Sequence, residues 1–288
     1  MKIRRRLGCF GRLLIVLLII IVLVIILLFD SNTRLVTTEY ELHYDGLPGA
    51  FEGYRIVLLA DIHGAEHGED NASLTAAVKG ANPDIIVIAG DLIDRFQPGN
   101  PVKKQIEIAE TLVYQLVRIA PVYYVTGNHE WDSGEIHSLL AMLEQNDVTV
   151  LKNQYRHLTA NGESIILAGV DDPGGPADMI KPEQFIERIH ERENADFIIV
   201  ISHRNYNLQL YSELGVDLIL SGHAHGGMVR LPFTDGLVGP QYELFPTYTS
   251  GVYVMGDTNM AVSRGLGNHF GWTRFLNNPE VVVVELRG

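Results

Sequence analysis

Side chains that can bind metal ions recur along this sequence directly after short apolar stretches. The segments are Asp61-Ile62-His63, Gly90-Asp91, Gly127-Asn128-His129-Glu130, Ser202-His203 and Gly222-His223-Ala224-His225. Carboxylate, amide and imidazole groups without a thiolate suit hard or borderline divalent ions such as Mn²⁺, Fe²⁺, Zn²⁺, Mg²⁺ or Co²⁺. An aspartate such as Asp91 has two oxygens and can bridge two ions about 3.5–4 Å apart, the spacing of two-metal hydrolytic sites. The residue types therefore indicate a hydrolytic metal centre.

The spacing of these residues suggests how they converge. In Asp61-Ile62-His63 and His223-Ala224-His225, alternate side chains would share one face of an extended segment. Glycines at positions 90, 127 and 222 would let the backbone turn sharply beside them. We therefore expect each pair to direct two ligands into one cavity.

The elements that must position these residues alternate between apolar strands and helical stretches. The expected strands are Leu35–Tyr44, Arg55–Ala60, Asp84–Ala89, Val122–Thr126, Ser164–Ala168, Phe197–Ser202, Asp217–Leu220, Gly251–Asp257 and Val281–Leu286. The expected helices are Ser73–Gly80, Pro101–Ile119, Gly134–Gln145, Pro182–Arg192 and Tyr206–Glu213. Such alternation predicts an α/β sheet that is covered on both faces, with ligands bound beyond the carboxyl ends of its strands. The segment Gly222–Tyr248 is rich in Gly and Pro and predicts a long loop beside the site.

An unbroken apolar run of 17 residues, Leu13–Phe29, precedes these elements and lacks a polar face. It predicts a transmembrane helix. The alternative is a cleaved signal peptide, but the run is long for that role, and Phe29-Asp30-Ser31-Asn32 offers no small-x-small cleavage site. Lys2, Arg4, Arg5 and Arg6 place the N-terminus in the cytoplasm and the body outside. We expect an anchor at 1–34 and a catalytic domain at 35–288.

Charge and cysteine content exclude other classes of protein. The formal net charge is −13, although the first twelve residues carry five cations and no acid. So acidic a body is a poor partner for duplex nucleic acid, whose binding requires cations that neutralise phosphates. Cys9 is the only cysteine, which excludes an intrachain disulfide and a thiolate metal cluster.

Taken in order, the five segments resemble the motifs of the calcineurin-like metallophosphoesterases, from about Arg55 to His225. Later stretches, including Phe245-Pro246 and Ser263-Arg264-Gly265-Leu266-Gly267, resemble the membrane-associated bacterial branch of that family. The resemblance implies a four-layer α/β/β/α sandwich of two mixed sheets with a dinuclear metal site at the strand ends. It assigns one ion to Asp61, His63, Asp91 and His225, and the other to Asp91, Asn128, His203 and His223. His129 would face the scissile phosphate without binding metal.

The resemblance also implies an activity, which is hydrolysis of a phosphodiester or phosphomonoester by a water that two metal ions activate. The anchor suggests a membrane or cell-envelope substrate, such as a lipid-linked phosphate. The alternative is a catalytically weak metal-binding scaffold of the same fold. No ligand of the family is replaced here, since the departures at Asn205 and Ala224 are not ligand positions. The identity of the ions (Mn, Fe, Zn or Mg), the preferred ester and the oligomeric state stay open.

Four other features have two interpretations each. Glu130 either orients a histidine or is a solvated loop acid, and Asp94-Arg95 is either a helper pair or ends in a surface arginine. Asp171-Asp172-Pro173 is either a turn or a contact with the site. Arg264, in a glycine-rich loop, either meets a phosphate or has no role in the site.

Overall fold

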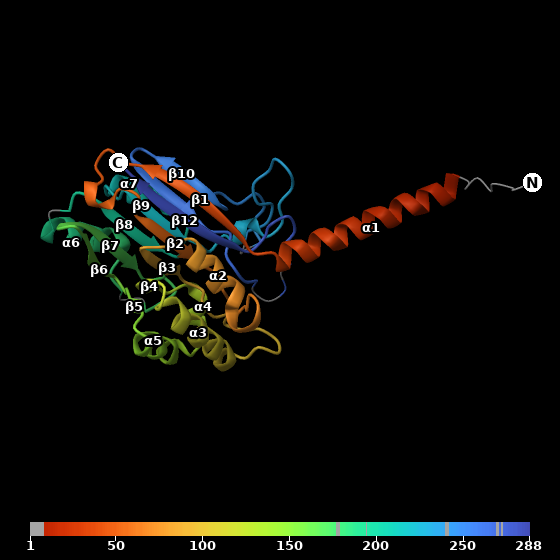
Figure 1. Ribbon diagram of the computed structural model, residues 1–288, viewed down its shortest axis with the longest axis horizontal. Helices are drawn as coiled ribbons and strands as arrows, with labels where there is room; N and C mark the ends of the chain where they lie inside the picture. The colour runs from red at the N-terminus through yellow and green to blue at the C-terminus, as the bar shows by residue number, and fades with distance from the viewer. Residues whose placement is uncertain (1–8, 177–178, 194, 240–241, 269–270, 272) are drawn as a thin grey trace, which may run out of the picture.

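The computed structural model describes residues 9–176, 179–193, 195–239, 242–268, 271 and 273–288. Two six-stranded sheets face each other, and helices cover their outer faces (Figure 1). A long N-terminal helix, α1 (Cys9–Thr33), extends away from this body. The predicted four-layer α/β/β/α sandwich with one preceding apolar helix is confirmed.

The first sheet has the order β1-β12-β2-β3-β4-β5. Its strands are β1 (Val36–His43), β12 (Glu280–Arg287), β2 (Arg55–Leu59), β3 (Ile85–Ala89), β4 (Val122–Val125) and β5 (Thr149–Val150). Strand β12 runs parallel to β1 and antiparallel to β2, while β2 to β5 are parallel to one another. Strand β1 therefore begins at the edge of the sheet where β2, β3 and β4 end.

The second sheet has the order β10-β11-β9-β8-β7-β6. Its strands are β10 (Gly251–Met255), β11 (Thr258–Val262), β9 (Leu218–Ser221), β8 (Ile198–Ser202), β7 (Glu163–Val170) and β6 (Gln154–Ala160). Strands β11, β9, β8 and β7 are parallel, and the outer strands β10 and β6 are antiparallel to their neighbours. Both sheets are mixed, as the resemblance implied.

Burial on both faces explains why the central strands are apolar throughout. In β2, Ile56 and Leu58 pack between the two sheets, whereas Val57 and Leu59 pack against helices. The helices on the first sheet are α2 (Ala72–Gly80), α3 (Val102–Leu116) and α5 (Ile136–Gln145). Those on the second sheet are α6 (Pro182–Arg192) and α7 (Leu208–Glu213).

The sequence prediction missed three strands and one short helix, α4 (Asn128–Asp132). Strand β6 is half exposed and carries polar residues, so it shows no apolar run. Strand β5 has two residues, and β11 follows β10 through a tight turn that the sequence did not separate from it. Strands β5 and β6 lie at the sheet edges, where burial imposes the weakest pattern.

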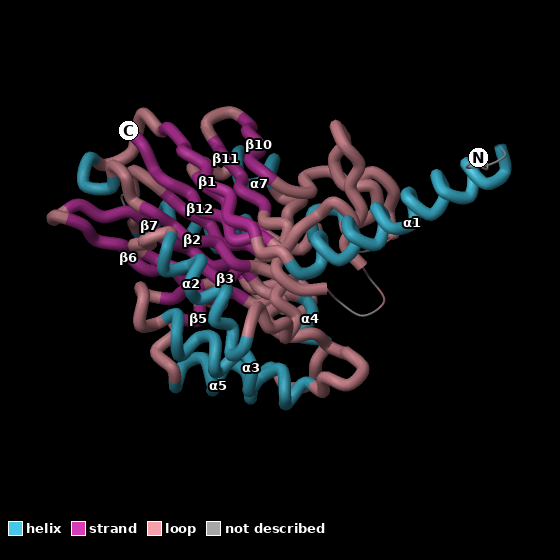
Figure 2. Tube along the Cα trace, turned by 45° about the vertical axis from the view of Figure 1, so that its right-hand side comes forward, coloured by secondary structure: helices cyan, strands magenta, loops and turns pink. Residues whose placement is uncertain are grey.

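Helix α1 is longer than the predicted apolar run. The most apolar 18 residues of this helix have a mean hydropathy of 3.6, and none of them is buried in the protein. This helix is long and apolar enough to cross a membrane. Lys2, Arg4, Arg5 and Arg6, on which the predicted orientation depends, lie outside the described residues. Figure 2 shows that loops occupy the space between the strand ends and the base of α1.

Candidate metal centre

The chemical residues predicted from the sequence meet at one end of the two sheets. They follow β2, β3 and β4 of the first sheet and β8 and β9 of the second. Carboxyl ends of parallel strands meet at one edge of a sheet, which explains why segments so distant in sequence converge.

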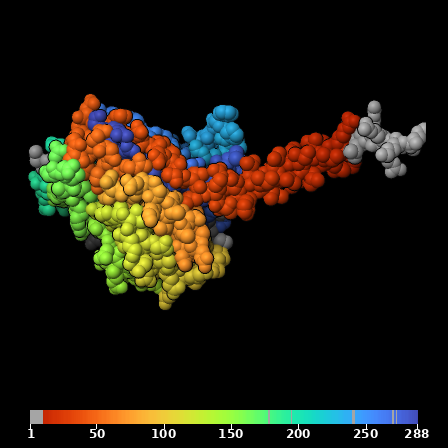
Figure 3. Space-filling view, viewed as in Figure 1, coloured from red at the N-terminus to blue at the C-terminus, as the bar shows by residue number. Residues whose placement is uncertain are grey.

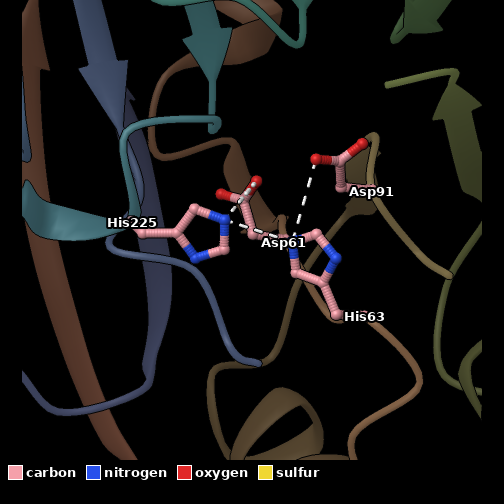
Figure 4. A group of neighbouring side chains, drawn as sticks. All are labelled: Asp61, His63, Asp91 and His225. Carbon is pink, nitrogen blue, oxygen red and sulfur yellow. Dashed lines mark hydrogen bonds and ion pairs between the residues drawn. The ribbon is translucent and has the colours of Figure 1, made fainter. Parts of the chain in front are cut away.

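The first cluster consists of Asp61, His63, Asp91 and His225 (Figure 4). His63 Nε2 lies 3.1 Å from His225 Nε2 and 3.8 Å from Asp91 Oδ2. His225 Nε2 lies 3.7 Å from Asp61 Oδ1. All four side chains are buried. The first cluster is therefore enclosed by protein.

The second cluster contains Asp91, His203 and His223, with Asn128 beside them. His203 Nε2 lies 3.2 Å from Asp91 Oδ2 and 3.3 Å from both His223 Nδ1 and Asn128 Oδ1. His203 Nδ1 faces the carbonyl oxygen of Ala89 at 2.8 Å. That bond points Nε2 of the ring into the cluster, as second-shell bonds of ligand histidines do. Asp91 thus belongs to both clusters.

The donor chemistry of the two clusters fits a pair of divalent ions. Both consist of imidazole nitrogens and carboxylate or amide oxygens, and Asp91 can offer an oxygen to each. The charge and hydrogen bond of Asp91 bear on this fit. Burial of His203 disfavours its charged imidazolium. The charge of Asp91 and its hydrogen bond to His203 outweigh this effect and raise the pKa of His203 to about 10. A cation that enters the second cluster must therefore displace a proton from His203.

The backbone at these residues is strained, which corrects one prediction. Asp61, His63, Asp91, His223 and His225 all have positive φ, between 48° and 69°. The expected extended conformation of the two pairs is wrong, because each ligand sits in a left-handed turn that a non-glycine residue seldom adopts. Such strain persists at functional sites when the surrounding structure imposes it.

The glycines beside the clusters have different roles. Gly90 has a φ of 80° and makes the predicted sharp turn. Gly127 and Gly222 instead provide space, because a Cβ at either position would collide with the side chain of Asp91 or Asp61. For these two glycines the predicted reason was incomplete.

Glu130 neither orients a histidine nor lies in solvent, so both interpretations drawn from the sequence are wrong. It is fully buried and contacts backbone rather than a histidine ring. Its carboxylate accepts hydrogen bonds from the backbone N–H groups of Asp91, Leu92, Ile93 and Gly127, at 2.6–3.2 Å. Glu130 therefore clamps the loop after β3 to the start of α4, which fixes Asp91 relative to Asn128.

His129 lies at the junction of the two clusters. Its Nε2 is 4.0 Å from Asp91 Oδ2, and its Nδ1 is 2.7 Å from Asp94 Oδ1. Burial disfavours the imidazolium, but the bond to Asp94 and the charges of Asp91, Asp94 and Glu130 raise the pKa of His129. Asp94 is thus a positioning partner of His129. Arg95 instead forms an exposed ion pair with Asp132 at 3.0 Å.

Arg204 belongs to the site, although the sequence motifs did not predict a role for it. It is held by Asp172, with Nε 2.7 Å from Oδ2 and Nη2 3.2 Å from Oδ1. Its Nη1 lies 3.1 Å from His223 Nε2. Two features of the sequence could have indicated Arg204: its position directly after His203, and the nearby Asp171-Asp172 pair. Asp172 contacts the site through Arg204. Arg204 borders a cavity of about 300 Å³ whose lining includes His203, Pro173, Tyr206 and Leu210.

Two further arginines support the site from behind. Arg264 forms an ion pair with Glu280 at 2.8 Å, so the suggestion that it meets a phosphate finds no support. Arg274 is fully buried and donates to the carbonyl oxygens of Arg264 and Gly267, both at 2.7 Å. Burial lowers the pKa of Arg274 to about 10, and the charge of Asp61 partly offsets this. Arg274 thus holds together the loop that packs against Asp61.

Comparison with known proteins identifies this arrangement. A family model described as calcineurin-like phosphoesterase matches residues 54–227. The metallophosphoesterase YkuE of Bacillus subtilis (strain 168) is 30% identical over 256 residues, which cover 87% of this chain and 85% of that protein. The phosphodiesterase YaeI of Escherichia coli (strain K12) is 26% identical over 237 residues, covering 81% of this chain and 82% of that protein. A transmembrane protein with a metallophosphoesterase domain from Danio rerio is 27% identical over 266 residues, covering 86% of this chain and 56% of that protein.

The family match spans more than half of the chain, so the protein belongs to the calcineurin-like phosphoesterases. It is a metal-dependent hydrolase of phosphoesters with a dinuclear divalent metal site. The resemblance inferred from the five segments is confirmed, and the relatives in Bacillus and Escherichia agree with its bacterial branch.

Proposed function

We propose that this calcineurin-like phosphoesterase hydrolyses a phosphodiester or phosphomonoester of the membrane or cell envelope. The observation that supports this most directly is Asp91, whose carboxylate lies between two clusters of imidazoles. In this proposal, Asp61, His63, Asp91 and His225 hold one ion, and Asp91, Asn128, His203 and His223 hold the other. Two such ions lower the pKa of a water and neutralise charge on phosphate oxygens.

The protein's own groups supply the remaining steps. Asp94 accepts the Nδ1–H of His129 and so directs Nε2 toward the centre. In this proposal Nε2 donates a proton to the leaving oxygen, and the raised pKa of His129 favours the protonated ring that this role needs. Arg204, aligned by Asp172, presents a fixed guanidinium beside the second cluster, where it can pair with a phosphate oxygen.

The membrane context follows from α1. We infer that residues 1–34 anchor the chain, with the N-terminus in the cytoplasm, and that residues 35–288 form the catalytic domain outside. The length and hydropathy of α1 support the anchor, as does similarity to a Danio rerio protein named as transmembrane. Tethering keeps the catalytic domain close to the bilayer, which favours substrates that are part of the membrane or linked to lipid.

The second candidate function is a metal-binding scaffold with weak catalysis. All the proposed ligands are present in the two clusters, and His129 keeps its partner Asp94. A scaffold would have no need of His129 or of the aligned Arg204. The observed geometry therefore favours the enzyme.

One assay separates the alternatives. The full chain in detergent is stripped of metal, supplied with Mn²⁺, Mg²⁺, Zn²⁺ or Fe²⁺, and tested on bis-p-nitrophenyl phosphate and p-nitrophenyl phosphate. Restored release from the diester would establish a phosphodiesterase, and release from the monoester alone a phosphatase. Failure on both substrates, with two ions bound, would contradict hydrolysis of simple esters and favour the scaffold.

A further inference from the structure

Helix α1 is docked on the body near the metal centre rather than attached by a free linker. Ser31 Oγ accepts from Leu276 N at 2.8 Å, and Asn32 exchanges two hydrogen bonds with the backbone of Arg274, at 2.9 and 3.1 Å. Asn278 Nδ2 donates to Asp30 O at 2.8 Å. We call Arg274–Asn278 the junction segment. These bonds fix the direction in which α1 leaves the body.

Sheet topology places this junction at the end of the molecule that carries the metal centre. Strand β1 begins at Val36, three residues after α1 ends, and Val36 pairs with Glu280 of β12. Two residues further along β12, Val282 pairs with Leu58, which lies three residues before Asp61. Neighbouring strands are about 5 Å apart, so the base of α1 lies close to the first cluster.

The junction segment also contacts the metal centre directly. Asn277 Nδ2 donates to the carbonyl oxygens of His225 and Met228, at 2.7 and 3.2 Å. On its other side, Arg230 N donates to Phe275 O at 2.9 Å, and Val229 forms a bridge with Phe275. The base of α1, a proposed ligand loop and the segment from Val229 onward therefore share one support.

Large apolar side chains project from the segment that begins at Val229. We call them the apolar tip; they are Leu231, Phe233, Tyr242, Leu244 and Phe245, with exposed fractions of 45%, 107%, 73%, 71% and 73%. Phe233, Tyr242 and Phe245 have positive φ, a strained conformation for aromatic residues. In Figure 3, the light-blue segment around these residues protrudes on the side of the body from which α1 leaves. Exposed apolar groups gathered in this way mark an interaction surface.

We propose that the apolar tip inserts into the surface of the bilayer that α1 crosses, so that the metal centre faces lipid headgroups. The bilayer fits this surface because α1 and the tip leave the same end of the body and are braced by the same junction segment. Aromatic side chains are enriched at membrane interfaces, where their rings sit at headgroup level. This inference rests on the anchoring role of α1 in the proposed function, and it identifies headgroup phosphates of that bilayer as the substrate class within reach.

Site-specific labelling tests the contact independently of catalysis. In the full chain with Cys9→Ser, a single cysteine at Phe233→Cys carries an environment-sensitive nitrobenzoxadiazole dye, and the protein is reconstituted in phosphatidylcholine–phosphatidylglycerol vesicles. The matched control is Val254→Cys, an exposed apolar position (66%) in β10, at the end of the second sheet away from the metal centre. Spin-labelled lipids should quench the dye at position 233 and leave the dye at position 254 largely unaffected. Equal quenching at both positions would overturn the proposal. Quenching at neither position would also overturn it, and is the result expected if the tip binds a second copy of the chain.

A kinetic test links the contact to the substrate. Phe233→Asp with Phe245→Asp should lower hydrolysis of hexadecyl p-nitrophenyl phosphate in vesicles by about tenfold or more, because burying charge at the interface is unfavourable. Hydrolysis of soluble bis-p-nitrophenyl phosphate should not change, since both side chains are exposed, whereas the proposed ligands are buried or partly buried. Equal loss with both substrates, or no loss with the vesicle substrate, would contradict the proposal. A chain that hydrolyses neither ester would refute the proposed function, while the labelling result would still decide the membrane contact.

Discussion

The two clusters of the metal centre use similar side chains but differ in their surroundings. The first, with Asp61, His63 and His225, is closed in by the loops after β2 and β9. The second, with His203 and His223, borders the cavity and has Arg204 within 3.1 Å of His223. From this difference we propose that the first position only holds an ion, whereas the second also meets substrate. Asp91 is the only residue common to both clusters among the described side chains.

Removing Asp91 should abolish the difference between the two metal positions, because both positions lose a ligand at once. We expect Asp91→Ala to contain neither ion and to lose more than about a thousandfold in turnover. Metal content by plasma mass spectrometry and hydrolysis of bis-p-nitrophenyl phosphate measure the two effects. Asp235→Ala, which removes an exposed carboxylate, is the control. A variant that retains two ions would show that Asp91 does not bridge.

Single ligand changes should separate the two positions. His63→Ala should lose the enclosed ion and His223→Ala the ion beside the cavity, each variant retaining about one ion per chain. The unequal surroundings predict that exchange of metal with solution is faster at the second position in the wild-type protein. Metal content and the rate of ion exchange measure this, and equal exchange at both positions would remove the distinction.

His129 should matter for turnover but not for metal content. We expect His129→Ala to lower kcat about 10²- to 10⁴-fold, the usual contribution of a general acid, with both ions retained. Asp94→Asn should give a smaller loss, because the ring keeps its position but loses the anionic partner that raises its pKa. The exposed His137→Ala serves as control. Loss of metal in His129→Ala would mean that the ring is a ligand.

Arg204 tests whether the second position meets substrate. Arg204→Met should raise KM or lower kcat by about 10- to 100-fold without loss of metal. Arg204→Lys should recover only part of this, because lysine lacks the fork that pairs with Asp172. The surface variant Arg95→Met should be close to wild type. If Arg204→Met matches wild type in both constants, the arginine has only a structural role.

The last prediction concerns pH, where each pH unit should change metal affinity by no more than about tenfold. The pKa of His203, about 10, lies above the value near 6.5 expected in the unfolded chain. In metal-free protein, the stability from this contact is therefore complete below pH 6.5 and is lost as the pH rises toward 10. Metal binding has the opposite dependence, because the ion must displace that proton, so affinity should rise up to about tenfold per pH unit. Chelator-treated protein, unfolded by denaturant at pH 6.5, 8 and 9.5, and metal titrations at the same pH values measure both trends. Metal affinity that does not change with pH would contradict this account.

The sequence by itself determined the layered α/β fold and the set of chemical residues. Apolar runs such as Ile85–Ala89 are specified by burial on both faces, and a ligand placed after such a run must lie at the end of the sheet. The five segments therefore indicate the family and a two-metal site by themselves. Short-range signals of this kind do not depend on how the sheets pack together.

Only the tertiary structure decided how those residues are held. The left-handed backbone of Asp61 and His225, the clamp by Glu130 and the alignment of Arg204 by Asp172 all arise from contacts between residues distant in sequence or from local strain. The docking of α1 beside the metal centre is likewise invisible to local pattern. It depends on β12 returning from the C-terminal region to lie between β1 and β2. Neighbouring residues cannot encode a partner more than two hundred positions away, because that contact forms only when the chain packs into its native topology.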